Sequence, residues 1–277
     1  MTNSPVKLYL ELMKKVLSFS MWPDPPVSVE TFSASRPLFK RAAVSFVSRI
    51  LALKQMGLFY TDQPSREDRY EGKVWPNWAD TMIGIPRLNN IQECVEAIIK
   101  ENVEGDLIET GVWRGGACVF MRAILAAYGV EGRRVFVADS FQGLPEPDEK
   151  YPADSASKYH TFPRLAISLD EVRNNFQKYD LLDDKVIFLP GWFKDTLTTP
   201  SIGKLAVMRL DGDIYSSTIE ALNSLYPKLS PGGFCIIDDY ALSGCRKAVD
   251  DYRAEHNIAD HIHKIDWTGC FWRKAKK

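Results

Sequence analysis

The chain has 277 residues and a formal net charge of -1, with 45% hydrophobic and 26% charged residues. This apolar content supports a large core and excludes a globally disordered protein. The balanced charge gives no reason to bind a polyanion, so we expect no nucleic-acid partner. No run approaches the roughly 18 apolar residues of a membrane span, and the N-terminus is too charged for a signal peptide. We therefore predict a cytoplasmic protein that makes no membrane contact, built as one large domain with an extension.

The first 80 residues differ in character from the rest of the chain. Amphipathic helical patterns at 6–19 and 38–56 flank a proline-rich loop that no helix could cross. An irregular connector with two tryptophans follows, of a kind typical of lids and contacts. We interpret residues 1–80 as a helical lid or oligomerisation extension and residues 81–277 as the main domain. We expect a homodimer or a higher homo-oligomer.

From residue 87 onward, strand and helix patterns alternate. Short apolar runs predict buried strands at 106–110, 134–139, 185–190, 204–210 and 233–238. Helical patterns lie at 88–101, 117–128, 169–179, 216–225 and 244–255. The runs HIHKI and GCFWRK close the chain and predict an antiparallel hairpin at one edge. We predict an α/β fold with a mostly parallel, Rossmann-like seven-stranded sheet, whose ligands bind beyond the carboxyl ends of the strands.

The first three strand ends carry residues suited to a nucleoside with a cationic group. The first ends in ETGVWRGG, where Glu109 would repel a phosphate but would suit a cation. This is neither a Walker loop nor a clean G-x-G-x-x-G, and a plain turn is its structural alternative. Asp139 at the second end is placed to take the two hydroxyls of an adenosine ribose, with an Asx turn as the alternative. At the third end, Gly191 and Trp192 could flank an adenine, although a tryptophan at the core edge is almost as common.

The fourth and fifth strand ends carry the most specific signal, a group of carboxylates. The segment LDGDIY contains Asp211 and Asp213, and IIDDY contains Asp238 and Asp239. Carboxylates at adjacent strand ends repel one another unless a cation is present. Oxygen ligands of this type suit Mg²⁺, Mn²⁺ or Ca²⁺. Helix capping would explain one acid at each end but not two, so we predict a divalent metal site.

The cysteines and histidines carry weaker signals. None of the five cysteines forms a C-x-x-C pair, and we expect reduced, mostly buried thiols. His261 and His263 would share one face of a strand, and without a third partner we expect them to face solvent. His160 lies in the segment 145–162, which we interpret as a flap near the second strand end. We expect that His160 could touch the substrate.

The segments ETGVWRGG, DSFQGLP, PGWF, RLDGDIYSST and IIDDY, in this order, resemble the macrocin O-methyltransferase family. Members of that family methylate deoxysugar hydroxyls on macrolide and aminocoumarin antibiotics. The resemblance covers roughly residue 79 to the C-terminus and implies a class I methyltransferase domain at 81–277. It also implies S-adenosylmethionine as cofactor and a divalent metal, usually Mg²⁺. The family has a variable helical lid before this domain.

The resemblance also implies roles for individual residues. It assigns Asp211, Asp238 and Asp239 to the metal, and Asp211 also to the general base. A metal would lower the pKa of a bound hydroxyl and orient it, and Asp211 would take the proton. The residues that it assigns to the cofactor are Thr81, Met82, Glu109, Thr110, Gly111, Val112, Trp113, Asp139, Ser140, Phe141, Gln142, Gly143, Ser168, Gly191 and Trp192.

The predicted function is a metal-dependent O-methyltransferase of antibiotic biosynthesis that acts on a sugar hydroxyl of a glycosylated small molecule. Two other classes of protein stay open. A metal-dependent glycosyltransferase could use the D-x-D of Asp211 and Asp213, but a UDP-sugar would meet repulsive carboxylates at Glu109 and Asp139. A non-catalytic cofactor-binding protein of the same fold would leave the metal cluster unexplained.

Overall fold

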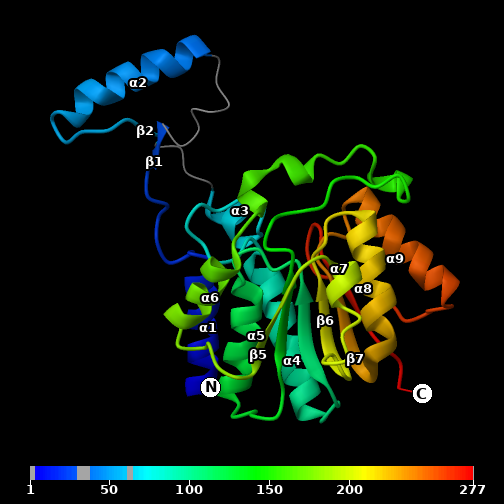
Figure 1. The fold of residues 1–277 in the computed structure, drawn as a ribbon. Helices are drawn as coiled ribbons and strands as arrows, with labels where there is room; N and C mark the ends of the chain where they lie inside the picture. Colours follow the sequence, from blue (N-terminus) through cyan, green and yellow to red (C-terminus); the bar gives the residue numbers. More distant parts are fainter. Residues whose placement is uncertain (1–3, 30–37, 61–64, 277) are drawn as a thin grey trace.

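A seven-stranded sheet forms the centre of the protein in the computed structural model, which describes residues 4–29, 38–60 and 65–276 (Figure 1). The strand order is β5-β4-β3-β6-β7-β9-β8. The strands are β3 (Asp106–Thr110), β4 (Val135–Asp139), β5 (Val186–Pro190), β6 (Leu205–Leu210), β7 (Leu229–Ile237), β8 (His263–Lys264) and β9 (Cys270–Arg273). The first five in this order are parallel, whereas β9 runs antiparallel to both β7 and β8. This topology confirms the predicted mostly parallel sheet with an antiparallel hairpin at one edge.

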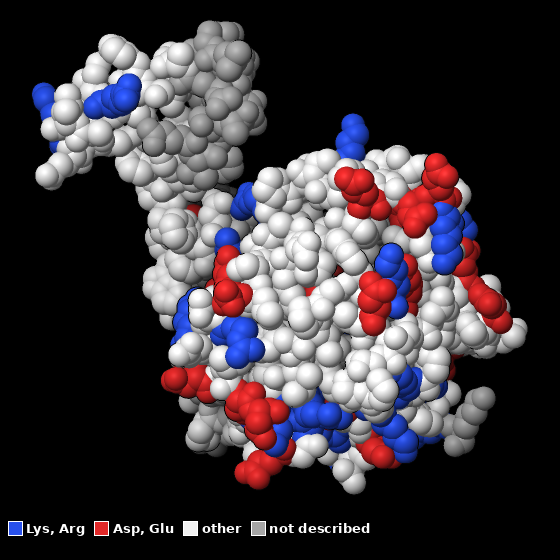
Figure 2. Space-filling model, viewed as in Figure 1, with Lys and Arg blue, Asp and Glu red and all other residues white. Residues whose placement is uncertain are grey.

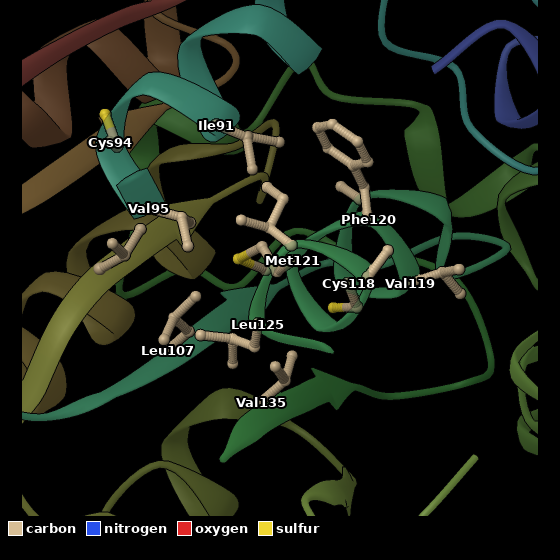
Figure 3. Close-up of a cluster of buried hydrophobic side chains, with 14 of the residues drawn as sticks. Ile91, Cys94, Val95, Leu107, Cys118, Val119, Phe120, Met121, Leu125 and Val135 are labelled. Carbon is tan, nitrogen blue, oxygen red and sulfur yellow. The ribbon is translucent and has the colours of Figure 1, made fainter. Parts of the chain in front are cut away.

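Helices cover both faces of the sheet because successive side chains of each strand point to opposite faces. Leu107 of β3 joins one hydrophobic cluster and Ile108 joins the other. The first cluster includes α4 (Ile85–Lys100), α5 (Gly116–Ala127) and α6 (Leu169–Lys178). The second includes α7 (Phe193–Thr196), α8 (Tyr215–Leu225) and α9 (Ser243–Glu255). Figure 3 shows part of the first cluster, where Val95 and Leu125 gather around Leu107.

The N-terminal residues divide between the core and a projecting arm. Helix α1 (Pro5–Leu17) packs against α4 and α5, and buries Leu10, Met13 and Leu17 in the first cluster. In contrast, α2 (Leu38–Ala52) lies apart from the body, beside the two-stranded ribbon of β1 (Val27–Ser28) and β2 (Phe59–Tyr60) (Figure 1). A short helix, α3 (Arg66–Tyr70), follows. Helix α1 therefore shares the core of the main domain, and the lid or oligomerisation role of residues 1–80 stays a prediction.

The flap (145–162) crosses the strand ends and contains two short 3-10 turns, at Pro152–Asp154 and Tyr159–Thr161. A third turn, Pro163–Leu165, follows it. Asp154 anchors the flap, because its carboxylate accepts the backbone N–H groups of Tyr215 and Ser216 at 2.7 and 2.8 Å. These groups lie at the N-terminus of α8, where a negative charge is favourable. Among the described helices, none has the length and apolar character to cross a membrane.

Candidate active site

The parallel register brings the ends of neighbouring strands together at one edge of the sheet. Thr110 pairs with both Ala138 and Leu210, and Leu210 pairs with Ile237. The residues that follow these pairs surround a cavity of about 500 Å³. Its wall includes Met82, Gly111, Trp113, Asp139, Ser140, Gln142, Gly143, Leu144, Pro145, Glu146, Asp148, Tyr151, His160, Leu165, Gly191, Trp192, Phe193, Lys194, Asp211, Gly212, Asp213, Ser216, Ser217 and Glu220. Residues predicted for the cofactor thus share one cavity with Asp211, the one member of the predicted metal triad that lines it.

The glycine turn after β3 is closely fitted to the end of β6. Gly111 has a φ of +79°, and a Cβ atom there would lie 1.7 Å from the carbonyl oxygen of Asp211. No residue with a side chain fits this position. Two residues later, Trp113 also has a positive φ of 47°, which is uncommon for a residue that is not glycine and is typical of functional loops. The turn therefore holds its backbone close to Asp211 and leads into α5.

Asp139 joins the loops that follow β3 and β4. Its carboxylate accepts the backbone N–H of Val112 at 2.8 Å and that of Phe141 at 2.7 Å. Burial raises the pKa of Asp139, and these hydrogen bonds oppose that shift. The Asx turn given as its structural alternative is therefore present, and Asp139 also lines the cavity. Its role toward a ribose stays a prediction.

Several residues predicted for the cofactor do not line the cavity. Ser168 caps helix α6, where its hydroxyl oxygen accepts the N–H of Glu171 at 3.2 Å. Thr81 accepts the N–H of Ile83 at 3.3 Å and is buried. The predicted cofactor residues that do not line the cavity are Thr81, Glu109, Thr110, Val112, Phe141 and Ser168. Those that line it are Met82, Gly111, Trp113, Asp139, Ser140, Gln142, Gly143, Gly191 and Trp192.

Glu109 takes part in a buried charge network under the cavity. It forms an ion pair with Arg209, and the thiol of Cys118 donates to it at 2.8 Å. Burial raises the pKa of Glu109 to about 7, although the nearby Arg209 opposes the shift. The guanidinium of Arg209 also donates to Asp211 at 2.9 Å. The sequence prediction included neither contact of Glu109. The ion pair with Arg209 depends on the register of β3 and β6, and the contact with Cys118 depends on how α5 packs on β3.

Asp211, Asp213 and Asp239 form a carboxylate cluster, of which Asp211 and Asp213 line the cavity. One oxygen from each lies within 4.8 Å of the others. The backbone N–H of Asp213 donates to Asp239 at 3.0 Å, and Asp213 has a positive φ of 58°. Burial and the neighbouring carboxylates raise the pKa of Asp211 to about 6, that of Asp213 to about 8 and that of Asp239 in the same direction. Close carboxyl groups resist ionising at the same time unless a cation is present. One oxygen from each of the three therefore gives a set of ligands that fits a divalent cation.

Asp238 lies outside this cluster. One of its oxygens is paired with Arg209 and the other with Arg87, which comes from helix α4. The Nε atom of Arg87 also lies 2.9 Å from a carboxylate oxygen of Asp266, in the loop before β9. Arg87 therefore forms ion pairs with both Asp238 and Asp266. The structure therefore brings together two members of the predicted metal triad, Asp211 and Asp239, and places Asp213 rather than Asp238 beside them. The D-x-D spacing of Asp211 and Asp213 was the sequence signal for this arrangement.

The weaker sequence signals are also placed by the structure. All five cysteines are free and buried, as expected. His261 and His263 are exposed, and their rings are nearly perpendicular with centroids 4.6 Å apart. Only His263 belongs to a strand, so the expected shared strand face is wrong for His261. His160 lies in the cavity wall, beside the flap residue Tyr159.

The sheet order and a cavity at the carboxyl ends of its parallel strands define a class I methyltransferase fold. The structure of the calicheamicin methyltransferase CalS11 shares this fold, with a TM-score of 0.56, 14% sequence identity and coverage of 99% of this chain and 94% of that chain. The chain belongs to the macrocin-O-methyltransferase (TylF) family, whose model matches residues 6–274. It is therefore an S-adenosylmethionine-dependent O-methyltransferase. The match also includes the N-terminal helices, which the sequence resemblance did not cover.

Similar proteins are O-methyltransferases according to their names, and one name specifies a rhamnosyl-bearing compound. The chain is 48% identical to the 8-demethyl-8-(2,3-dimethoxy-alpha-L-rhamnosyl)-tetracenomycin-C 4'-O-methyltransferase of Streptomyces olivaceus over 275 residues, which is 99% of this chain and 95% of that protein. It is 49% identical to the mycinamicin III 3''-O-methyltransferase of Micromonospora griseorubida over 242 residues, or 86% and 95% of the two chains. The structure of the O-methyltransferase NovP has a TM-score of 0.83 at 46% identity, and the match covers 98% of this chain and 100% of that one.

Proposed function

We propose that this enzyme transfers the methyl group of S-adenosylmethionine to a sugar hydroxyl of a glycosylated natural product, with the help of a divalent cation. One observation carries the proposal: Gly111 of the glycine turn lines the same cavity as Asp211 and Asp213, two members of the carboxylate cluster. A cofactor on the turn and a hydroxyl at the cluster would therefore face each other. The names of the similar methyltransferases support a sugar acceptor.

The chain's own residues would divide the work in this cavity. Asp139 would bind the ribose hydroxyls, and Gly191 and Trp192 would flank the adenine, because they lie at adjacent strand ends. Asp211 and Asp239 would hold the cation, which when bound lowers the pKa of an acceptor hydroxyl. Asp211 would accept the hydroxyl proton as the methyl group is transferred. The resemblance implies Asp238 as the third ligand, whereas the cluster geometry favours Asp213.

The face of the enzyme seen in Figure 2 gives no reason to expect a polyanionic acceptor. Figure 2 shows Lys, Arg, Asp and Glu side chains mixed along the margins of the body, without a large field of one sign in this view. Such a surface gives no electrostatic attraction for a polyanion. The family match leaves the glycosyltransferase and the non-catalytic alternatives without support. The homo-oligomeric state and the cytoplasmic location remain expectations from the sequence.

The reaction is tested with a panel of glycosides in the presence of S-adenosylmethionine. We expect a product heavier by one methylene group, loss of turnover after exhaustive chelation with EDTA, and recovery with Mg²⁺. Methylation at an undiminished rate in chelated protein would reject the cation. Calorimetric titration of Mg²⁺ into Asp213→Asn and Asp238→Asn then identifies the third ligand. The variant with the larger loss of Mg²⁺ affinity marks that ligand.

A further inference from the structure

A group of aromatic side chains lies at the surface where the flap meets the connector before α4. Trp75 is 46% exposed and Phe162 is 40% exposed, and their ring centroids lie 5.8 Å apart in an edge-to-face arrangement. Tyr159 continues the series, with its ring 6.0 Å from that of Phe162. Single exposed apolar residues are ordinary, but a contiguous group indicates a binding surface. We refer to Tyr159, Phe162 and Trp75 as the aromatic platform.

The platform adjoins the cavity, because His160 and Leu165, which are its neighbours along the chain, both line the cavity wall. Burial and then the charges of Asp213 and Asp239 raise the pKa of Tyr159. His160, the next residue along the chain, lines the cavity. At the far end of the platform, the cavity residue Trp113 donates its indole N–H to the carbonyl of Arg164 at 2.8 Å. The platform therefore lies beside the cavity in which the acceptor hydroxyl would bind.

Arg164 holds the two halves of the platform together. Its guanidinium donates to the side-chain oxygen of Asn77 at 2.7 Å and to the carbonyl oxygens of Trp75 and Pro76, both at 3.3 Å. The same guanidinium lies over the Trp75 ring, 5.9 Å from its centroid. The connector and the turn after the flap are nearly 90 positions apart in sequence, and these contacts fix them side by side. A surface held in this way loses little conformational freedom when a ligand binds.

We propose that the aromatic platform binds the aglycone of the acceptor, and that this aglycone contains a flat, apolar ring system. The inference rests on the proposed function, because it assumes a sugar hydroxyl at Asp211. A sugar that reaches the carboxylate cluster leaves the rest of its molecule at the rim of the cavity. Aromatic side chains bind flat rings by burying large apolar faces and by edge-to-face contact. The sugar offers little apolar surface of its own, so the aglycone would supply much of the affinity.

The test compares two probes, p-nitrophenyl α-L-rhamnoside and methyl α-L-rhamnoside, which share a sugar and differ in the ring. Their dissociation constants are measured by calorimetry with protein loaded with Mg²⁺ and S-adenosylhomocysteine. We expect the aryl glycoside to bind about tenfold more tightly to the unmodified protein, as an aromatic contact of about 1.4 kcal/mol requires. Trp75→Ala and Phe162→Ala should each reduce that ratio by about threefold or more and leave the affinity for methyl rhamnoside unchanged.

The matched control is Tyr128→Ala, because Tyr128 is also an exposed aromatic residue but does not line the cavity. It lies at the C-terminal end of α5, whereas the glycine turn precedes the N-terminus of that helix. It should keep the full preference for the aryl glycoside. Equal S-adenosylhomocysteine affinity in all variants confirms that the fold is intact. An equal affinity for both probes in the unmodified protein, or a preference retained in both platform variants, would overturn the platform. If neither glycoside binds while S-adenosylhomocysteine does, the sugar acceptor itself is wrong, and the platform falls with it.

Discussion

Arg209 and Glu109 form an ion pair in the middle of the sheet, where the register of β3 and β6 places them directly opposite each other. Both residues are about 1% exposed. The same guanidinium contacts Asp211 and Asp238. The guanidinium of Arg209 therefore connects β3, which precedes the glycine turn, with the ends of β6 and β7, which supply the carboxylates. A buried charge of this kind is tolerated only because each partner compensates the other.

Removal of the positive charge of Arg209 should destabilise the protein strongly. We expect Arg209→Met to lower the free energy of unfolding by about 3–5 kcal/mol, because it leaves buried carboxylates without a partner. Lys204→Met removes a cation from an exposed pair with Glu104 and should change stability by less than about 1 kcal/mol. Urea unfolding followed by circular dichroism measures both. Equal losses in the two variants would contradict a structural role for the buried pair.

The carboxylate cluster predicts a stability that falls as pH rises when no cation is bound. Burial raises the pKa of Asp211 to about 6 and that of Asp213 to about 8, whereas the unfolded chain releases these protons near pH 4. Between about pH 4 and 8 the folded protein holds more protons than the unfolded chain, so its stability decreases through this window. Melting temperatures of chelated protein should fall from pH 5 to 8, and Mg²⁺ should reduce the fall. Parallel curves with and without Mg²⁺ would speak against a cation at the cluster, and KCl of equal ionic strength is the control.

Substitution of Asp139 tests the cofactor site. Asp139→Ala removes the predicted ribose contact and also the acceptor for two backbone N–H groups. We expect S-adenosylmethionine to bind more weakly by about 1.5–3 kcal/mol, as for a lost charge-assisted hydrogen-bond pair. Calorimetry measures the change, and Asp184→Ala, at an exposed acid outside the cavity, serves as the control. Unchanged affinity in Asp139→Ala would remove Asp139 from the site.

Asp211→Asn separates the two roles proposed for Asp211. The asparagine keeps one oxygen for a cation but cannot accept the proton of the acceptor. If Asp211 is the general base, turnover should fall by about 10²–10⁴-fold even at saturating Mg²⁺. The measurement is a titration of Mg²⁺ into the variant while turnover is followed at saturating acceptor. Near-complete recovery of the rate would leave Asp211 as a ligand alone.

Helix α1 offers a test of how far the N-terminal residues belong to the core. Leu17 is fully buried against α5 and its neighbours, whereas Leu12 on the same helix is 48% exposed. We expect Leu17→Ala to lower the free energy of unfolding by about 2–5 kcal/mol through lost burial and a cavity. Leu12→Ala should change it by less than about 0.5 kcal/mol. Similar effects at both positions would show that α1 does not contribute to the core as its burial indicates.

The sheet could be predicted from the sequence because its strands are covered on both faces and therefore read as continuous apolar runs. The run at 134–139 corresponds to β4, for example, within one residue. The prediction for β7 began four residues late, because Pro231 and Gly232 interrupt the pattern near its start. The ribbon of β1 and β2 was missed altogether, since strands of two residues carry no periodicity.

The site was predictable where local sequence decides it and not where tertiary contacts do. The glycine turn and Asp139 follow strands, so their positions could be derived from the strand ends. The choice between Asp213 and Asp238 could not, because it depends on Arg87, which is 151 positions from Asp238 in the chain. The packing of α1 depends likewise on distant partners. Its amphipathic pattern indicates a covered face without showing what covers it.

The close fit of Gly111 against Asp211 has a consequence for protein engineering. A library that varies Gly111, at the floor of the cavity, would lose most of its members to backbone clashes, because even a methyl group there meets the carbonyl oxygen of Asp211. The flap and the connector are built differently, since their side chains, such as Trp75 and Phe162, are partly exposed and tolerate replacement. Directed evolution toward new acceptors should therefore randomise the flap and the connector and keep the floor constant.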